Sequence, residues 1–168
     1  MVGNGRANRL KSYYYIPNSL TKINITDALQ INTAAFINCE DICEINLNDS
    51  INHIGDFAFQ NCKKLDTIAL PKNLMTLGGA AFKQCVSLQK LEIPVNITEI
   101  SEYCFFECNN LLNIKFNDNI VKLSAYSFYA CENLKNIELP RGLNIIEEYA
   151  FFNCNSFTEI RIPHKVTQ

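Results

Sequence analysis

The sequence contains few of the residues on which enzymes depend. His53 and His164 are its only histidines, they lie far apart in the chain, and each is predicted to lie in a surface turn. No Ser–His–Asp order, no phosphate-binding glycine loop and no cluster of metal ligands is present. These absences predict a protein that is not an enzyme and that holds no cofactor.

Other absences exclude broad classes of partner. The sequence has no run of about 18 apolar residues, so it predicts no segment that inserts into a membrane. Its formal net charge is −2, whereas nucleic-acid binding needs a basic surface, so no nucleic-acid partner is expected. Residues 1–12 are polar and lack the apolar region of a signal peptide.

The sequence does contain a repeat of 23 residues. A phenylalanine recurs at this spacing, and a cysteine follows each phenylalanine three residues later. The members of the two series are Phe36, Phe59, Phe82, Phe105, Phe128 and Phe151, and Cys39, Cys62, Cys85, Cys108, Cys131 and Cys154. A period of this size is typical of a solenoid, in which each unit stacks on the next.

One repeat combines a strand, a turn and a short return segment. In the stretch around Ile68 and Leu70, residues predicted to point inward and outward alternate with period two, as they do in a half-buried strand. Pro71 follows, and proline ends strand pairing because it has no N–H group. The i, i+3 spacing of Phe82 and Cys85 predicts a short helical or 3₁₀ piece. Because the unit repeats by translation, the strands are predicted to form a parallel ladder in an α/β solenoid.

The repeats define the expected domain organisation. Residues 1–19 are predicted to form an N-terminal tail with a partial leading strand. Residues 20–168 are predicted to form one array of six complete repeats and a truncated seventh, with seven strands in the ladder. The last repeat stops without a polar capping unit, and this feature indicates a piece of a longer protein.

The regular position of the cysteines predicts burial rather than chemistry. One thiol per repeat faces the core, where cysteine packs as a small hydrophobic residue. A zinc site needs four converging ligands, and the close pair Cys39 and Cys43 has no second pair to complete it. We therefore expect no metal ion. Cys43 falls on a variable strand position and is expected to be the most reactive thiol.

These residues also carry a family resemblance. Residues 71–94, with the sequence PKNLMTLGGAAFKQCVSLQKLEIP, resemble the BspA-like (treponemal-type) leucine-rich repeats. The resemblance extends from about Ile16 to the end of the chain. It implies a right-handed curved solenoid, with the strand ladder on the concave side and short helical or 3₁₀ segments on the convex side. It further implies a cell-surface or secreted protein that adheres to host matrix or cell-surface proteins. The resemblance implies no catalytic residue in this sequence.

The concave face is predicted to carry charged residues that point outward from the strands. They are Lys90, Glu92, Lys115, Glu138 and Arg161. The last four alternate in sign on successive strands, which allows cross-strand pairing. Two interpretations remain open, a solvated ladder that avoids like-charge repulsion and a polar binding surface.

The convex face is predicted to carry an aromatic stripe beside the core phenylalanines. Its six residues are Tyr103, Phe106, Tyr126, Tyr129, Tyr149 and Phe152. They are interpreted either as half-buried cover for the core or as a contact patch for a partner.

Three non-enzymatic functions are therefore considered. The leading hypothesis is a protein-binding module of an adhesion protein that engages a host matrix or cell-surface protein. The second is a structural spacer that projects another domain of a longer protein, and the third is an intracellular scaffold. The sequence specifies neither the ligand, nor the face that binds it, nor an oligomeric state.

Overall fold

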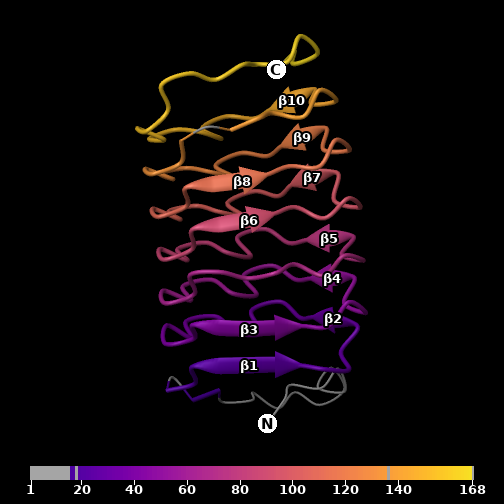
Figure 1. Ribbon diagram of the computed structural model, residues 1–168, viewed down its shortest axis with the longest axis vertical. Helices are drawn as coiled ribbons and strands as arrows, with labels where there is room; N and C mark the ends of the chain where they lie inside the picture. The colour runs from indigo at the N-terminus through magenta and orange to yellow at the C-terminus, as the bar shows by residue number, and fades with distance from the viewer. Residues whose placement is uncertain (1–15, 18, 136, 168) are drawn as a thin grey trace.

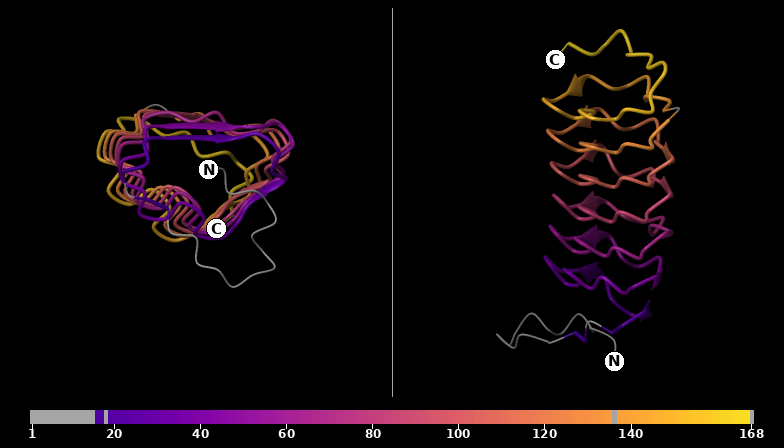
Figure 2. Two further views of the ribbon diagram at one scale, coloured as in Figure 1. Left: turned by 90° about the horizontal axis from the view of Figure 1, so that it is seen from below. Right: turned by 90° about the vertical axis from the view of Figure 1, so that its left-hand side faces the viewer.

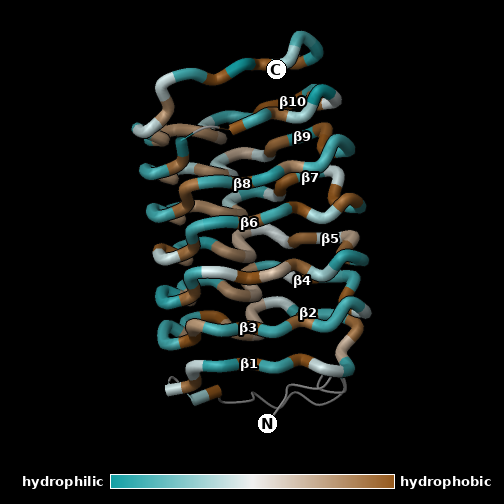
Figure 3. Tube along the Cα trace, viewed as in Figure 1, coloured by the Kyte–Doolittle hydropathy of each residue, from teal (hydrophilic) through white to brown (hydrophobic). Residues whose placement is uncertain are grey.

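The chain forms a parallel-strand β-solenoid. The computed structural model describes residues 16–17, 19–135 and 137–167, so the tail predicted over residues 1–19 lies almost wholly outside the described residues. Successive coils stack along one long axis (Figure 1). Viewed along that axis, the coils superpose in a three-sided outline (Figure 2). Hydrophilic and hydrophobic residues alternate around each coil (Figure 3), as expected where every coil contributes side chains to a common core.

The predicted strand ladder is present in part, as two separate two-stranded sheets within the first two-thirds of the array. Its strands are β1 (Lys22–Ile25), β3 (Glu44–Leu47), β6 (Lys90–Glu92) and β8 (Asn113–Lys115). β1 pairs with β3 and β6 pairs with β8, both in parallel, and a bridge from Thr67 to Lys90 links the intervening coil. The alternating burial of β1 confirms the period-two prediction. The expected seven strands are not all formed, because residues 68–70, 137–139 and 160–162 are not strands. We call this side the concave face, a label taken from the sequence prediction.

A second ladder of very short parallel strands lies on another side of each coil. Its members are β2 (Gln30–Ile31), β4 (His53–Ile54), β5 (Thr76–Leu77), β7 (Glu99–Ile100), β9 (Lys122–Leu123) and β10 (Ile145–Ile146). They form the sheets β2-β4-β5 and β7-β9-β10. Two residues are too few to produce a recognisable alternation, so the sequence pattern did not predict this ladder.

The helical or 3₁₀ segments expected on the convex side are absent from the described residues, and that prediction was wrong. The segments with the phenylalanines and cysteines are consecutive turns instead. The N–H of Cys108 donates to the carbonyl of Phe105 within its own coil at 3.2 Å, whereas the N–H of Phe105 donates to Ser127 of the next coil at 2.8 Å. A turn closed from i to i+3 gives the same residue spacing as a 3₁₀-helix, which explains the error. We call this turn-rich side the convex face.

The core contains the two predicted ladders of side chains. Phe59, Phe82, Phe105 and Phe128 are fully buried, and consecutive rings stack with centroids 5.3–5.7 Å apart. Five of the core thiols donate to carbonyls of the preceding coil, namely those of Cys62, Cys85, Cys108, Cys131 and Cys154. The Sγ of Cys85, for example, lies 3.1 Å from the carbonyl oxygen of Phe59. Seven of the eight cysteines are buried and Cys43 is exposed, so the predicted burial of the repeat cysteines is confirmed.

One glycine is required by the contact between adjacent coils. A Cβ on Gly78 would lie 2.5 Å from both the nitrogen of Asp56 and the carbonyl carbon of Gly55. Such a contact forces the backbone of one coil to move. We expect Gly78→Ala to lower the free energy of unfolding by about 1–3 kcal/mol, the usual cost of overpacking, measured by urea denaturation.

The neighbouring glycine provides the control for this prediction. A Cβ on Gly79 would meet its nearest atom, the carbonyl oxygen of Glu102, at 3.4 Å, so Gly79→Ala should change stability by less than about 1 kcal/mol. Equal destabilisation by the two variants would show that close approach of the coils at Gly78 is not the cause.

Candidate functional site

The concave face is a polar surface that partly neutralises its own charge. Lys115 Nζ on β8 lies 2.7 Å from Glu92 Oε1 on β6, and both side chains are exposed. The predicted cross-strand pairing is therefore confirmed for these two residues. Arg161 instead pairs with Glu159 of its own segment at 2.9 Å. Because the last two coils have no strand at this position, the expected alternation does not continue as a ladder of ion pairs.

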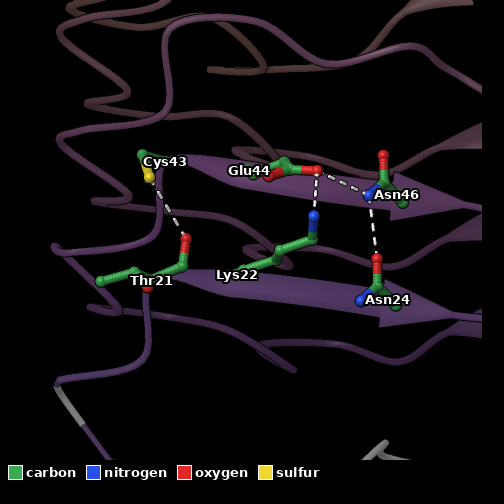
Figure 4. A network of polar contacts seen from close by, with 6 residues as sticks. All are labelled: Thr21, Lys22, Asn24, Cys43, Glu44 and Asn46. Carbon is green, nitrogen blue, oxygen red and sulfur yellow. Dashed lines mark hydrogen bonds and ion pairs between the residues drawn. The ribbon is translucent and has the colours of Figure 1, made fainter.

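The same self-pairing is seen at the N-terminal end of the concave face (Figure 4). Lys22 Nζ lies 2.7 Å from Glu44 Oε1, and Asn46 Nδ2 donates to Glu44 at 2.9 Å and to Asn24 Oδ1 at 2.8 Å. The hydrogen bonds from Lys22 and then Asn46 lower the pKa of Glu44. Side chains that satisfy one another in this way must exchange partners before they bind a ligand. The face also offers few aromatic anchors for an interface.

The structure brings the six aromatic residues of the predicted convex stripe into contact. We call them the aromatic stripe. In one column Tyr126 stacks between Tyr103 and Tyr149, with centroid distances of 4.9 and 5.1 Å. In the second column Tyr129 stacks between Phe106 and Phe152, at 4.7 and 5.2 Å. The two columns touch across the coil, as in the Tyr126–Tyr129 pair at 5.8 Å.

The aromatic stripe is more exposed toward its C-terminal end. Tyr103, Phe106, Tyr126 and Tyr129 are half-buried, whereas Tyr149 and Phe152 are 50% and 47% exposed. The first interpretation, cover for the core, therefore fits the half-buried rings, whereas the second, a contact patch for a partner, stays a prediction. The stripe covers the core on its inner side and presents aromatic surface to solvent on its outer side.

Three tyrosines of the aromatic stripe have a backbone conformation that disfavours large side chains. Tyr103, Tyr126 and Tyr149 have φ values of 55°, 57° and 56°. Glycine or asparagine adopts this left-handed region at lower cost, and a bulky residue there is rare. The same conformation recurs at Ala34, Phe57 and Ala80 in the earlier coils, so it is a property of the coil and does not by itself mark a binding site.

No second class of site emerges from the part of the chain that the structure describes. Within it, no group of three or more His, Cys, Asp or Glu residues could hold a metal ion. Among the same residues, no helix is long and apolar enough to cross a membrane. His53 lies in β4 rather than in the predicted surface turn, and His164 is exposed in the predicted turn.

Stacked coils with parallel ladders and extended outer faces define a β-solenoid repeat protein. The family model for the BspA type leucine-rich repeat region matches residues 8–131 and 75–168, with six copies of the repeat. The chain therefore belongs to the BspA-type leucine-rich repeat family, and the resemblance noted in the sequence is confirmed. Leucine-rich repeats generally mediate interactions between proteins, and this solenoid fold is typically non-catalytic.

Solved structures of bacterial leucine-rich repeat proteins share the fold. A protein from Bacteroides ovatus is 33% identical with a TM-score of 0.85 over 89% of this chain and 39% of its own. A protein from Eubacterium ventriosum is 28% identical with a TM-score of 0.80, over 88% and 40% of the two chains. The Treponema pallidum leucine-rich repeat protein is 26% identical with a TM-score of 0.82, over 86% and 71%. The chain thus spans about two-fifths of the first two proteins. No curated protein matches it.

Proposed function

We propose that this chain is a non-enzymatic protein-binding module and that it binds its partner through the aromatic stripe. The observation that carries the proposal is the stack of six half-buried or exposed rings in two columns on the convex face. Tyrosine and phenylalanine supply large contact areas at interfaces, and the tyrosine hydroxyls can bind polar groups or water. The concave residues, Lys90, Glu92, Lys115, Glu138 and Arg161, are proposed as a secondary, polar contact surface.

The type of residue found at one left-handed position of the coil supports this choice of face. Glycine at the three left-handed positions would relieve about 1 kcal/mol of backbone strain each. Earlier coils have Ala34, Phe57 and Ala80 at the equivalent positions, so the fold does not require tyrosine there. The presence of tyrosine at this position in three successive coils supports a role of these side chains in binding.

The module is further proposed to belong to a cell-surface or secreted adhesion protein that engages a host matrix or cell-surface protein. The support is family membership, because BspA-like repeats are associated with adhesion at cell surfaces. A spacer that projects another domain is the second candidate. The polar, self-paired concave face would suit a spacer, but exposed aromatic surface would not.

The test is capture of immobilised matrix and cell-surface proteins by the purified chain. We expect saturable binding that the double variant Tyr126→Ala/Tyr129→Ala weakens at least about tenfold, because aromatic anchors dominate most interfaces. The matched comparison is Glu92→Ala/Lys115→Ala, which removes an ion pair from the proposed secondary surface on the concave face and should weaken capture much less than the tyrosine double variant does.

The capture measured for each variant must be compared with the thermal unfolding of the same variant. Each tyrosine is half-buried, so its truncation removes stacking of about 0.5–1.5 kcal/mol in addition to its buried area. The double variant is therefore assayed at a temperature at which its melt shows that it is folded. A folded wild-type chain that captures nothing would favour the spacer. Capture that is lost only in the concave variant would move the binding surface to that face.

A further inference from the structure

The hydrogen-bonded ladder of the concave face lacks one step. At the position before each strand, a backbone N–H donates to a carbonyl of the preceding coil. These bonds run from Cys43 to Thr21, from Gln89 to Asp66, from Leu112 to Gln89 and from Lys135 to Leu112. Among the described residues the series is interrupted once, because the N–H of Asp66 makes no bond to Cys43. β3 accordingly does not pair with residues 67–70.

The second ladder also lacks one step. The N–H groups of Gly55, Gly78, Ser124 and Glu147 each donate to a carbonyl of the preceding coil at 2.8–2.9 Å. Ser101 occupies the equivalent position, but its N–H makes no such bond in the part of the chain that the structure describes. β5 and β7 are unpaired, and they lie further apart than the paired strands on either side of them (Figure 1).

The two missing steps lie at the two ends of residues 66–78, which we call the crossing segment. The start of this segment bonds to the following coil, through the N–H of Gln89 and the bridge from Thr67 to Lys90. Its end bonds to the preceding coil, through the pairing of β5 with β4 and the N–H of Gly78. The crossing segment therefore runs diagonally between two blocks of coils, one before it and one after it.

The convex face joins the two blocks without interruption. The N–H groups of Phe36, Phe59, Phe82, Phe105 and Phe128 all donate to the following coil at 2.8–2.9 Å. The core is continuous as well, since Leu77 and Ile100, which flank the gap in the second ladder, are only 2% and 0% exposed. An array that is continuous on one side and interrupted on two others has the geometry of a hinge, with its axis along the convex face.

A serine hydroxyl bridges the gap in the second ladder. Ser101 Oγ donates to the carbonyl of Leu77 at 2.6 Å, and this carbonyl is the acceptor that the Ser101 N–H would use in a regular ladder. One coil later, the N–H of Ser124 makes the regular bond to Ile100 at 2.9 Å. The Ser101 hydroxyl thus spans a step that the Ser101 N–H does not reach.

We propose that the array hinges at the crossing segment, between the observed open state and a closed state in which β5 pairs with β7. In the closed state the N–H groups of Thr98 and Ser101 donate to the carbonyls of Met75 and Leu77, and the Ser101 hydroxyl is released. Closure turns the block that carries the aromatic stripe relative to the N-terminal part of the concave face (Figure 4). The hinge does not depend on the proposed binding function.

Amide hydrogen exchange, followed residue by residue by NMR, tests whether the second ladder is open. We expect the amides of Thr98 and Ser101 to exchange at least about tenfold faster than those of Val121 and Ser124, after correction for intrinsic rates. Val121 and Ser124 are the counterparts one coil later, and both donate to the preceding coil, whereas an amide without an acceptor is little protected. Equal protection of the two pairs would overturn the proposal.

Disulfide trapping tests whether the gap closes. Thr76→Cys/Glu99→Cys places thiols on β5 and β7, across the gap. The matched control Glu99→Cys/Lys122→Cys keeps one of these positions and uses the paired strands β7 and β9. Both are made in a Cys43→Ala chain, which lacks the exposed native thiol, and are treated with oxidised glutathione. We expect the gap pair to cross-link at least about tenfold more slowly than the control, but to completion.

Two results of the trapping experiment would overturn the hinge. If the gap pair never cross-links while the control does, the gap is fixed. If the gap pair cross-links as fast as the control, there is no gap to close. Circular dichroism melts of both variants, with trapping done well below the transition, exclude unfolding as the source of cross-links.

A serine variant tests the hydroxyl bridge. Ser101→Ala removes a hydrogen bond that only the open state makes, so it should speed cross-linking of the gap pair at least about threefold. Ser124→Ala is the matched control and should leave the rate unchanged, because the regular bond at that position comes from the backbone. An equal effect of the two variants would show that the Ser101 hydroxyl does not hold the gap open.

Discussion

Phe105→Ala is expected to lower the free energy of unfolding by about 3–5 kcal/mol, the usual cost of truncating a buried phenylalanine. The Phe105 ring is fully buried and stacks on Phe82 at 5.7 Å and on Phe128 at 5.3 Å. Its removal leaves a cavity in the middle of the array, where coils on both sides lose contacts. Since a domain of this size is stable by about 5–15 kcal/mol, the variant should be close to unfolding in mild denaturant.

The control for Phe105 is the next residue in the chain. Phe106 is half-buried in the aromatic stripe and stacks on one ring of its column. Phe106→Ala should therefore cost clearly less than Phe105→Ala, at most about half as much. Urea denaturation monitored by circular dichroism measures both. A loss below about 1 kcal/mol for Phe105→Ala would mean that the ring does not pack in the core.

The sequence was sufficient to predict the solenoid, the inward phenylalanines and the buried thiols. Each is a consequence of one physical rule. A residue type that recurs at one position of every coil forms a column along the axis of the solenoid. A column of apolar residues is stable only when it lies in the core. The constant spacing of 23 residues is enough to align these columns.

The convex side could not be predicted in the same way. The i, i+3 spacing of Phe105 and Cys108 fits a helix and a series of turns equally well. The two differ in where the backbone N–H groups point, and here every second one reaches the next coil, as that of Phe105 does to Ser127. That choice depends on the neighbouring coil, so a single repeat does not reveal it.

The candidate site was predicted in part. The spacing of Tyr103, Tyr126 and Tyr149 in the sequence predicts one column, and their stacking follows from the coil repeat. The contact of Lys83 with Tyr103 and Phe106 was missed. A lysine in the preceding coil at the position equivalent to Phe106 was a signal that could have revealed it.

The buried thiols predict a pronounced loss of stability at alkaline pH. Burial raises the pKa of Cys85 to about 12, and burial together with neighbouring thiols raises the pKa of Cys62, Cys104, Cys108 and Cys131 above the ordinary value. In the unfolded chain these groups ionise near pH 9, whereas in the folded chain they stay protonated. The folded state therefore binds more protons above pH 9, and stability must fall as pH rises.

The size of the effect follows from the number of thiols. At pH 10 each fully buried thiol lowers the free energy of unfolding by about 1.4 kcal/mol relative to pH 7, and the five together lower it by about 7 kcal/mol. This is comparable with the whole stability of a domain of this size. Urea denaturation from pH 7 to pH 10, with a reductant present, should show the midpoint falling steeply above pH 9.

Cysteine variants separate this effect from the ionisation of other groups. Cys85→Ala should be less stable than the wild-type chain at pH 7, because the substitution leaves a cavity. Between pH 7 and pH 10, however, its free energy of unfolding should fall by about 1.4 kcal/mol less than that of the wild-type chain. Cys43→Ala removes an exposed thiol and is the control for the loss of a cysteine outside the core. If all three proteins lose stability in parallel, tyrosine or lysine ionisation causes the loss. The buried thiols would then stabilise the array only by packing, with no coupling between their protonation and folding.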